Sequence, residues 1–301
     1  MAFLSRTFAP VDGKDAEVHY GSGRLTHMQI KVGELTFDVT VDGPEDGRTV
    51  LLLHGFPETG RSWNAVRASL VRSGHRVIVP DQRGYSPGAR PDGVEAYGMR
   101  PIVADALGIL DALNVTTVDV VGHDWGANVA WCLATWHPER VRSLVAVSVP
   151  HPLAFGWAFH NDSDQQQRSS YILLFRIEGK AEKVLLADDA RRLRAMLTGL
   201  PSDSVEHYVS VLSEPGALTA ALNWYRAMKR PDTSDLPPVT VPTTYVWSTK
   251  DLAVGEAAAQ KCGVHVDSTY RFVILDGVSH WIPEHAPDQL TAAILDQLAQ
   301  V

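Results

Sequence analysis

The sequence predicts an α/β fold, with a mostly parallel central sheet flanked by helices and a helical lid inserted after the sixth strand. Two observations carry this prediction. Short apolar strands alternate with helical patterns from residue 50 to residue 149, as in sheets that are covered on both faces. The alternation then stops and resumes only at residue 243, which leaves a helix-rich stretch between two parts of one sheet.

These changes of pattern divide the chain into three parts. Residues 1–27 are a polar, glycine-containing leader without a clear period. Residues 28–150 and 237–301 are expected to form the core, and residues 151–236 the lid. Four prolines, Pro231, Pro237, Pro238 and Pro242, are typical of a stiff linker where the lid returns to the core.

Composition excludes several classes of function. A chain of 301 residues can bury a substantial core, and its formal net charge of −8 argues against a nucleic-acid partner. Cys132 and Cys262, like His123, His137 and His151, lack the spacing of metal ligands, so we expect no metal, no cofactor and no disulfide scaffold. No apolar run approaches the ~20 residues of a membrane helix, and the N-terminal residues lack a signal-like apolar run. We expect a cytoplasmic protein without a membrane partner.

The core elements follow in order. Alternating apolar and polar residues on either side of Gly33 indicate an antiparallel hairpin of strands 28–32 and 35–41. Further strands are predicted at residues 50–53, 76–79, 118–121, 141–149, 243–248 and 270–275. Helices are predicted at residues 62–71, 102–113, 127–134 and 285–299 in the core, and at 181–197 and 204–212 in the lid.

Residues 122–126 join a predicted strand to a predicted helix and read Gly-His-Asp-Trp-Gly. A strand that ends in Gly-x-nucleophile-x-Gly and turns directly into a helix presents the central side chain above the carboxyl edge of the sheet. Glycine is needed on both sides because a Cβ there would collide with the neighbouring strand or helix. Asp124 is therefore the candidate nucleophile, with a plain turn or helix N-cap as the alternative.

Two more polar residues follow the last two predicted strands. Asp251 comes shortly after strand 243–248, and His280 lies in the Gly-Val-Ser-His-Trp segment after strand 270–275. Because the carboxyl ends of parallel strands meet at one edge of a sheet, both side chains are expected beside Asp124. Each alone is more often structural, but nucleophile, acid and histidine in this order predict a catalytic triad.

A loop after strand 50–53 reads His-Gly-Phe-Pro and completes the predicted site. A loop in this place supplies one backbone N–H of an oxyanion hole, and the residue after the nucleophile supplies the other. Phe56 and Trp125 are therefore the candidate donors, with a plain Gly-Pro turn as the alternative.

These motifs together resemble those of the epoxide hydrolases of the α/β-hydrolase superfamily, from Met28 to the C-terminus. The resemblance rests on His-Gly-Phe-Pro-Glu at 54–58, Asp-Gln-Arg-Gly-Tyr-Ser at 81–86, residues 122–126, Asp251 and residues 277–281. Two lid segments, 171–182 and 223–226, are similar to family segments that each carry a tyrosine. One departure is Glu178, which stands where the family usually has proline and could alter the lid near the first tyrosine.

The resemblance implies hydrolysis of a small apolar epoxide to a vicinal diol, with water as the second substrate. A carboxylate needs no deprotonation before it attacks an sp³ carbon, so Asp124 would form an alkyl ester directly. Tyr171 and Tyr225 are implied as the pair that activates the epoxide oxygen.

The second half of the implied reaction hydrolyses this ester. His280, oriented by Asp251, would activate the water, and the N–H groups of Phe56 and Trp125 would stabilise the oxyanion. The residues expected to line the substrate pocket are Pro57, Trp125, Trp224, Phe155 and Trp281.

Two alternative functions remain. A haloalkane-type dehalogenase also uses an aspartate nucleophile, but such enzymes commonly have asparagine where this chain has Phe56, and they lack the paired lid tyrosines. A non-catalytic ligand-binding protein on a hydrolase scaffold would not require Asp124, Asp251 and His280 together.

Overall fold

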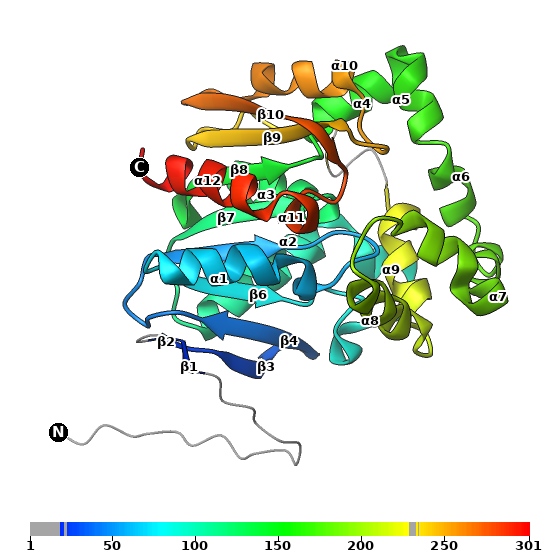
Figure 1. Ribbon diagram of the computed structural model, residues 1–301, viewed down its shortest axis with the longest axis horizontal. Coiled ribbons are helices and arrows are strands. Elements are labelled where there is room, and N and C mark those ends of the chain that lie inside the picture. The colour runs from blue at the N-terminus through cyan, green and yellow to red at the C-terminus, as the bar shows by residue number, and fades with distance from the viewer. Residues whose placement is uncertain (1–18, 21–22, 229–232, 234) are drawn as a thin grey trace.

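The computed structural model describes residues 19–20, 23–228, 233 and 235–301. These residues contain an eight-stranded sheet with the strand order β10-β9-β8-β7-β5-β6-β4-β3 (Figure 1). Its strands are β3 (Thr26–Val32), β4 (Leu35–Asp42), β5 (Thr49–Leu53), β6 (Arg76–Pro80), β7 (Val118–His123), β8 (Val141–Val147), β9 (Thr243–Lys250) and β10 (Tyr270–Ser279). The pairs β3–β4 and β4–β6 are antiparallel and the remaining neighbours are parallel, which confirms the predicted sheet.

The N-terminal region differs in part from the predicted leader, of which residues 1–18 and 21–22 lie outside the described residues. β1 (His19–Tyr20) and β2 (Gly23–Arg24) pair as a short antiparallel ribbon. β3 begins at Thr26, two residues before the prediction, because Thr26 and His27 pair in register with Val41 and Thr40. The hydrogen bonds between paired strands join backbone groups. Polar residues can therefore extend a strand even where no alternation of apolar and polar residues marks it.

Helices cover both faces of the sheet (Figure 1). α1 (Asn64–Arg72), α11 (Ile282–His285) and α12 (Pro287–Leu298) lie on one face, and α2 (Met99–Ala112) and α3 (Trp125–Trp136) on the other. The side chains of β5 alternate between these layers, with Val50 and Leu52 in one buried cluster and Leu51 and Leu53 in the other. Short 3₁₀ turns occupy Gly60–Trp63, Pro87–Ala89, Val94–Tyr97, Pro138–Arg140 and Cys262–His265, and α10 (Glu256–Gln260) follows β9.

Two predicted boundaries differ from the structure for backbone reasons. β8 ends at Val147, not at residue 149, because Ser148 has a φ of +67°, which no strand residue adopts. The C-terminal helix predicted over 285–299 is present as α12, which begins two residues later, and the short α11 precedes it. Ala286 separates the two helices with an extended φ of −137°, and Pro287 begins the second helix.

In the described residues between β8 and β9, six helices form the helical insertion, residues 152–226. They are α4 (Pro152–Asn161), α5 (Ser163–Arg168), α6 (Tyr171–Phe175), α7 (Lys180–Met196), α8 (Ser202–Ser213) and α9 (Ala217–Arg226). α6 to α9 lie beyond one end of the sheet (Figure 1), and α7 is kinked where residues 187–190 leave helical dihedrals. Residues 229–232 and 234, with Pro231 of the predicted linker, lie outside the described residues. Among the described residues, no helix combines the length and apolar character that a bilayer crossing requires.

Candidate active site

Asp124 lies at the sharp turn between β7 and α3. Its φ of +53° and ψ of −119° are rare for any residue except glycine. A Cβ added to Gly122 would lie 2.1 Å from the carbonyl oxygen of Gly126, and one added to Gly126 would lie 2.1 Å from the carbonyl oxygen of Leu53. The turn is therefore possible only with both glycines.

The position of Asp124 is also the point where the strand order reverses. From β5 the chain passes to β6 on one side and then to β7 on the other, and open α/β sheets bind ligands in the crevice at such a point. The backbone N–H of Phe56, in the loop after β5, donates a hydrogen bond of 2.8 Å to Oδ1 of Asp124. Trp125 begins α3, where the first N–H groups of a helix have no intrahelical acceptor.

His280 and Asp251 meet Asp124 at this edge. Nδ1 of His280 lies 3.0 and 3.1 Å from the two carboxylate oxygens of Asp251, and Nε2 of His280 lies 3.6 Å from Oδ2 of Asp124. All three side chains are buried. Asp251 is held further by the N–H groups of Ala253 and Val254, which donate to its Oδ1 at 2.8 and 3.0 Å. The structure thus brings the three predicted triad residues together.

The charges of these groups depend on one another. Burial alone would lower the pKa of His280, but the carboxylates of Asp251 and Asp124 raise it well above the ordinary value for histidine. Burial alone would raise the pKa of Asp124, but contact with His280, the nearby His123 and the Phe56 N–H hold it below its usual value. The two carboxylates therefore favour the protonated form of His280, and His280 in turn favours the ionised form of Asp124.

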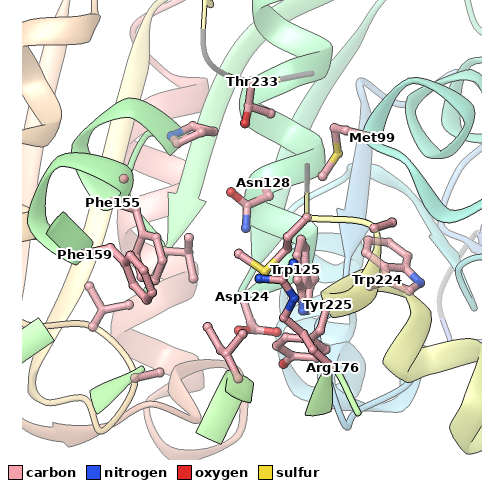
Figure 2. Close-up of a pocket in the computed structure, with 18 of the residues that line it drawn as sticks. Met99, Asp124, Trp125, Asn128, Phe155, Phe159, Arg176, Trp224, Tyr225 and Thr233 are labelled. Atoms are coloured by element: carbon pink, nitrogen blue, oxygen red, sulfur yellow. The ribbon is translucent and has the colours of Figure 1, made fainter. Parts of the chain in front are cut away.

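Two tyrosines of the helical insertion face the same cavity as Asp124. Tyr171 begins α6, Tyr225 lies in the last turn of α9, and both line a cavity of about 360 Å³ with Asp124 and Trp125. Figure 2 shows Tyr225 beside Asp124 and Trp125. The centroids of the two tyrosine rings are 6.1 Å apart. Burial, and then nearby groups that include Asp124, raise the pKa of both hydroxyls. Both are therefore neutral donors at neutral pH.

The pocket residues predicted from the sequence separate into two groups. Trp125, Trp224 and Phe155 line the cavity (Figure 2). Pro57 and Trp281 are not among its lining residues. Trp281 instead joins a buried cluster with the insertion residues Leu197, Leu200 and Tyr208.

Comparison with known proteins agrees with this arrangement. Residues 48–287 match the family model described as the alpha/beta hydrolase fold. The chain belongs to the α/β-hydrolase family. A similar curated protein is the AB hydrolase superfamily protein YfhM of Bacillus subtilis, 34% identical over 89% of this chain and 96% of that protein. Epoxide hydrolase A of Mycobacterium tuberculosis is 31% identical over 92% of this chain and 98% of that protein.

Among solved structures, Epoxide Hydrolase A from Mycobacterium thermoresistibile is similar with a TM-score of 0.81 and 26% sequence identity. The match covers 91% of this chain and 98% of that chain. This α/β hydrolase is accordingly an epoxide hydrolase-like enzyme.

Ser148 is a residue of the hydrolase site that sequence reasoning did not identify. Its Oγ donates a hydrogen bond of 2.7 Å to Oδ2 of Asp251 and lies 3.0 Å from Nδ1 of His280. The residue follows β8 directly, so it lies at the same sheet edge as the triad. A polar residue directly after a strand is the signal that could have identified Ser148. The predicted strand extended to residue 149, however, and so included Ser148.

A buried pair behind the triad of this hydrolase was also missed. Nδ1 of His123 lies 3.0 Å from Oε2 of Glu58, and Nε2 of His123 lies 2.9 Å from the carbonyl oxygen of His280. Both side chains of the pair are fully buried. His123, assigned to structure in the sequence, thus supports the backbone that carries His280. Within the described part of the hydrolase, no group of three or more potential metal ligands occurs.

Proposed function

We propose that this α/β hydrolase is an epoxide hydrolase, which converts an epoxide to a vicinal diol through a covalent ester on Asp124. The observation that carries the proposal is one cavity lined by a carboxylate nucleophile, Asp124, and by two neutral tyrosine hydroxyls. In this proposal the helical insertion acts as a lid that supplies both tyrosines. The relatives named epoxide hydrolases support the same reaction.

The first step opens the ring. A carboxylate oxygen of Asp124 attacks an epoxide carbon, the carbon–oxygen bond of the ring breaks, and an alkyl ester forms. The oxygen that leaves takes a proton from Tyr171 or Tyr225. The alkoxide takes this proton because an alkoxide is a stronger base than a tyrosinate.

The second step hydrolyses the ester, and ester formation itself prepares His280 for it. Alkylation removes the charge of Asp124, one of the two carboxylates that raise the pKa of His280. The pKa of His280 therefore falls, and its proton passes to the tyrosinate that ring opening left. The neutral imidazole can then take a proton from water. The hydroxide attacks the ester carbonyl, and the N–H groups of Phe56 and Trp125 receive the negative charge of the oxyanion. Collapse of this intermediate breaks the ester bond, and the leaving alkoxide takes a proton from the protonated His280 to give the diol. The carboxyl proton of Asp124 then passes to His280, which restores the carboxylate.

A variant that forms the ester but cannot hydrolyse it tests this proposal. The His280→Gln variant should form the ester but not hydrolyse it, so intact-protein mass spectrometry after incubation with an epoxide should show an adduct of the substrate's mass. The matched control is the double variant Asp124→Ala/His280→Gln, which should show no adduct. Asp124→Ala alone should abolish diol formation.

Two results would count against the proposal. Diol formation by the unmodified enzyme without any adduct in His280→Gln would exclude the covalent route. Halide release from haloalkanes without diol formation from any of a panel of terminal, aryl and disubstituted epoxides would favour the dehalogenase alternative.

A further inference from the structure

A buried hydrogen-bond network behind the triad joins the core to the helical insertion. Nδ1 of His123 lies 3.0 Å from Oε2 of Glu58, and the carboxyl group of Glu58 is in hydrogen-bond contact with that of Glu284, in α11. The hydroxyl of Tyr208, in α8 of the insertion, donates a hydrogen bond of 3.1 Å to Glu284. The side chains of His123, Glu58 and Tyr208 are fully buried. Glu284 is therefore the member of the network through which α8 reaches the core.

The contact between the two glutamates requires a proton. Carboxylate oxygens only accept hydrogen bonds, so two ionised glutamates in contact repel each other. Oε1 of Glu58 is buried, and no donor among the described residues reaches it unless Glu284 carries a proton. A protonated Glu284 donates to Glu58 and still accepts from Tyr208. With this proton, each hydrogen bond of the network has a donor and an acceptor.

The surroundings of Glu284 offer no cation that would replace this proton. α11 packs against the 3₁₀ turn at 60–63, α1, α12 and β10. The charged and titratable groups on these elements, on α8 and on α11 itself, besides Tyr208 and Glu284, are Arg61, Arg67, Arg72, Asp203, Glu206, His207, Tyr270, Arg271, Asp276, His285, Asp288 and Asp296. The arginines form ion pairs with other aspartates or, for Arg72, a hydrogen bond with Ser69, and both histidines form hydrogen bonds elsewhere. Within the described residues, neither glutamate has a lysine or arginine partner.

The protonated state of Glu284 is therefore favoured at neutral pH but not in alkaline solution. Burial, and then the charge of Glu58, raise the pKa of Glu284 to about 8. Once ionised, Glu284 no longer donates to Glu58, and the two charges repel each other in a buried place. Separation of the two carboxylates requires α11 to move.

Movement of α11 reaches His280 through the backbone. α11 begins two residues after His280, and the N–H of Ile282 donates a hydrogen bond of 2.8 Å to the His280 carbonyl. The same carbonyl oxygen lies 2.9 Å from Nε2 of His123, at the other end of the network. Trp281, between His280 and α11, packs in one buried cluster with Tyr208. The segment that carries His280 is thus held from both ends of the network.

We propose that Glu284 is a positioning residue for His280. Its proton joins α8 and α11 to the core, and loss of this proton in alkaline solution loosens α8 and slows hydrolysis of the ester. Ring opening keeps its rate, because His280 takes no part in it. The inference rests on the proposed function for the ester itself, and it adds a pH-dependent control by a residue that does not line the cavity.

The pH profile of the second step tests the inference. In the unmodified enzyme, the single-turnover rate of ester hydrolysis should fall by about tenfold between pH 7 and about pH 9.5, because His280 loses its alignment. Titration of His280 alone would have the opposite effect, since alkaline solution favours the neutral imidazole that activates water.

Glu284→Gln separates this role from a merely structural one. The amide donates to Glu58 and accepts from Tyr208 as a protonated carboxyl does, but it does not titrate in this range. Ester hydrolysis in this variant should match the unmodified enzyme at pH 7 and change by less than about twofold up to about pH 9.5. The control is Glu34→Gln, which removes the same charge from the exposed turn between β3 and β4 and should keep the tenfold fall.

Thermal unfolding tests the proton on Glu284 without the reaction. The folded protein binds this proton more tightly than the unfolded chain does, so its contribution to stability is lost as the pH rises from the ordinary pKa of 4.5 through about 8. Over this range, the melting temperature of the unmodified enzyme should fall relative to that of Glu284→Gln.

Hydrogen exchange provides a measurement that needs no variant. Between pH 7 and about pH 9.5, after correction for the intrinsic exchange rate, the amides of α8 should lose about tenfold in protection while those of α3 keep theirs.

The outcomes are distinct. If the melting temperatures diverge as expected but His280→Gln forms no adduct with any epoxide, the proton on Glu284 is supported and the proposed reaction is wrong. If ester hydrolysis has the same pH profile in the unmodified enzyme and in Glu284→Gln, the reaction is supported and the positioning role is wrong. Unchanged protection of α8 would also overturn the inference, even if the variant did not fold.

Discussion

The core and the helical insertion position their site residues by different forces. On the core side, Asp124, Asp251 and His280 are fixed by hydrogen bonds and backbone contacts at the carboxyl ends of β7, β9 and β10. On the insertion side, Tyr225 is fixed mainly by aromatic packing, with ring centroids 5.1 Å from Trp125 and 5.0 Å from Phe175. Hydrogen bonds and close backbone contacts require particular residue types, whereas packing accepts many. The core half should therefore tolerate less change than the insertion half.

The largest effect on kcat/KM is expected from Gly122→Ala, which adds a single methyl group to the core. Gly122→Ala would place a Cβ 2.1 Å from a backbone oxygen, so the elbow must move. We expect kcat/KM to fall by about 10⁴-fold, because both the nucleophile and the oxyanion donors lose their alignment. We also expect destabilisation of about 3 kcal/mol, the upper end of typical overpacking costs. Diol assays and urea unfolding measure the two effects.

The matched change in the insertion is Gly156→Ala. Gly156 lies within α4, and an added Cβ there has no heavy atom within 4 Å. The melting temperature of the Gly156→Ala variant should stay the same or rise, since alanine stabilises a helix by up to about 1 kcal/mol relative to glycine. Equal destabilisation by the two changes would contradict the proposed difference between the regions.

The same difference explains which site residues a sequence can reveal. Asp124 is predictable because its strained turn needs a glycine on each side, and Asp251 and His280 are predictable because they follow apolar strands. Ser148 is an ordinary polar residue after a strand, and only the fold places it against Asp251.

The second prediction concerns the tyrosines of the insertion. Tyr171→Phe and Tyr225→Phe should each slow ring opening by about 10²-fold, the lower end of the effect of a general acid, because the other tyrosine still donates a proton. Since packing holds both rings, the variants should remain as stable as the unmodified enzyme. Single-turnover kinetics of ester formation measures the effect.

The control for this prediction is Tyr208→Phe, in α8 of the same insertion. The hydroxyl of Tyr208 donates a hydrogen bond of 3.1 Å to Glu284 and does not line the cavity. Loss of this hydrogen bond should lower the free energy of unfolding by about 1 kcal/mol and leave the rate of ring opening unchanged. Wild-type rates in both cavity variants would show that the assignment of the two tyrosines is wrong.

The smallest effect is expected from Ser148→Ala, which tests whether a hydrogen bond in the core affects only the hydrolysis of the ester. In Ser148→Ala, Asp251 loses a donor at 2.7 Å, and the His280 Nδ1–H loses the Ser148 oxygen as a second acceptor. We expect ester hydrolysis to slow by about tenfold, as for one charge-assisted hydrogen bond, while ring opening keeps its rate because His280 takes no part in it. Ester should therefore accumulate at steady state, which intact-protein mass spectrometry detects.

Ser143→Ala provides the control for this change. Ser143 lies in β8, the strand that Ser148 follows, and its Oγ donates at 2.7 Å to the carboxylate of Asp119, away from the site. Each variant removes a buried hydroxyl that donates a hydrogen bond to a carboxylate, so the two should lose similar stability. Only Ser148→Ala should accumulate the ester. If both variants slow both steps equally, the hydrogen bond of Ser148 supports the fold alone, and the core residues around His280 act less specifically than their geometry indicates.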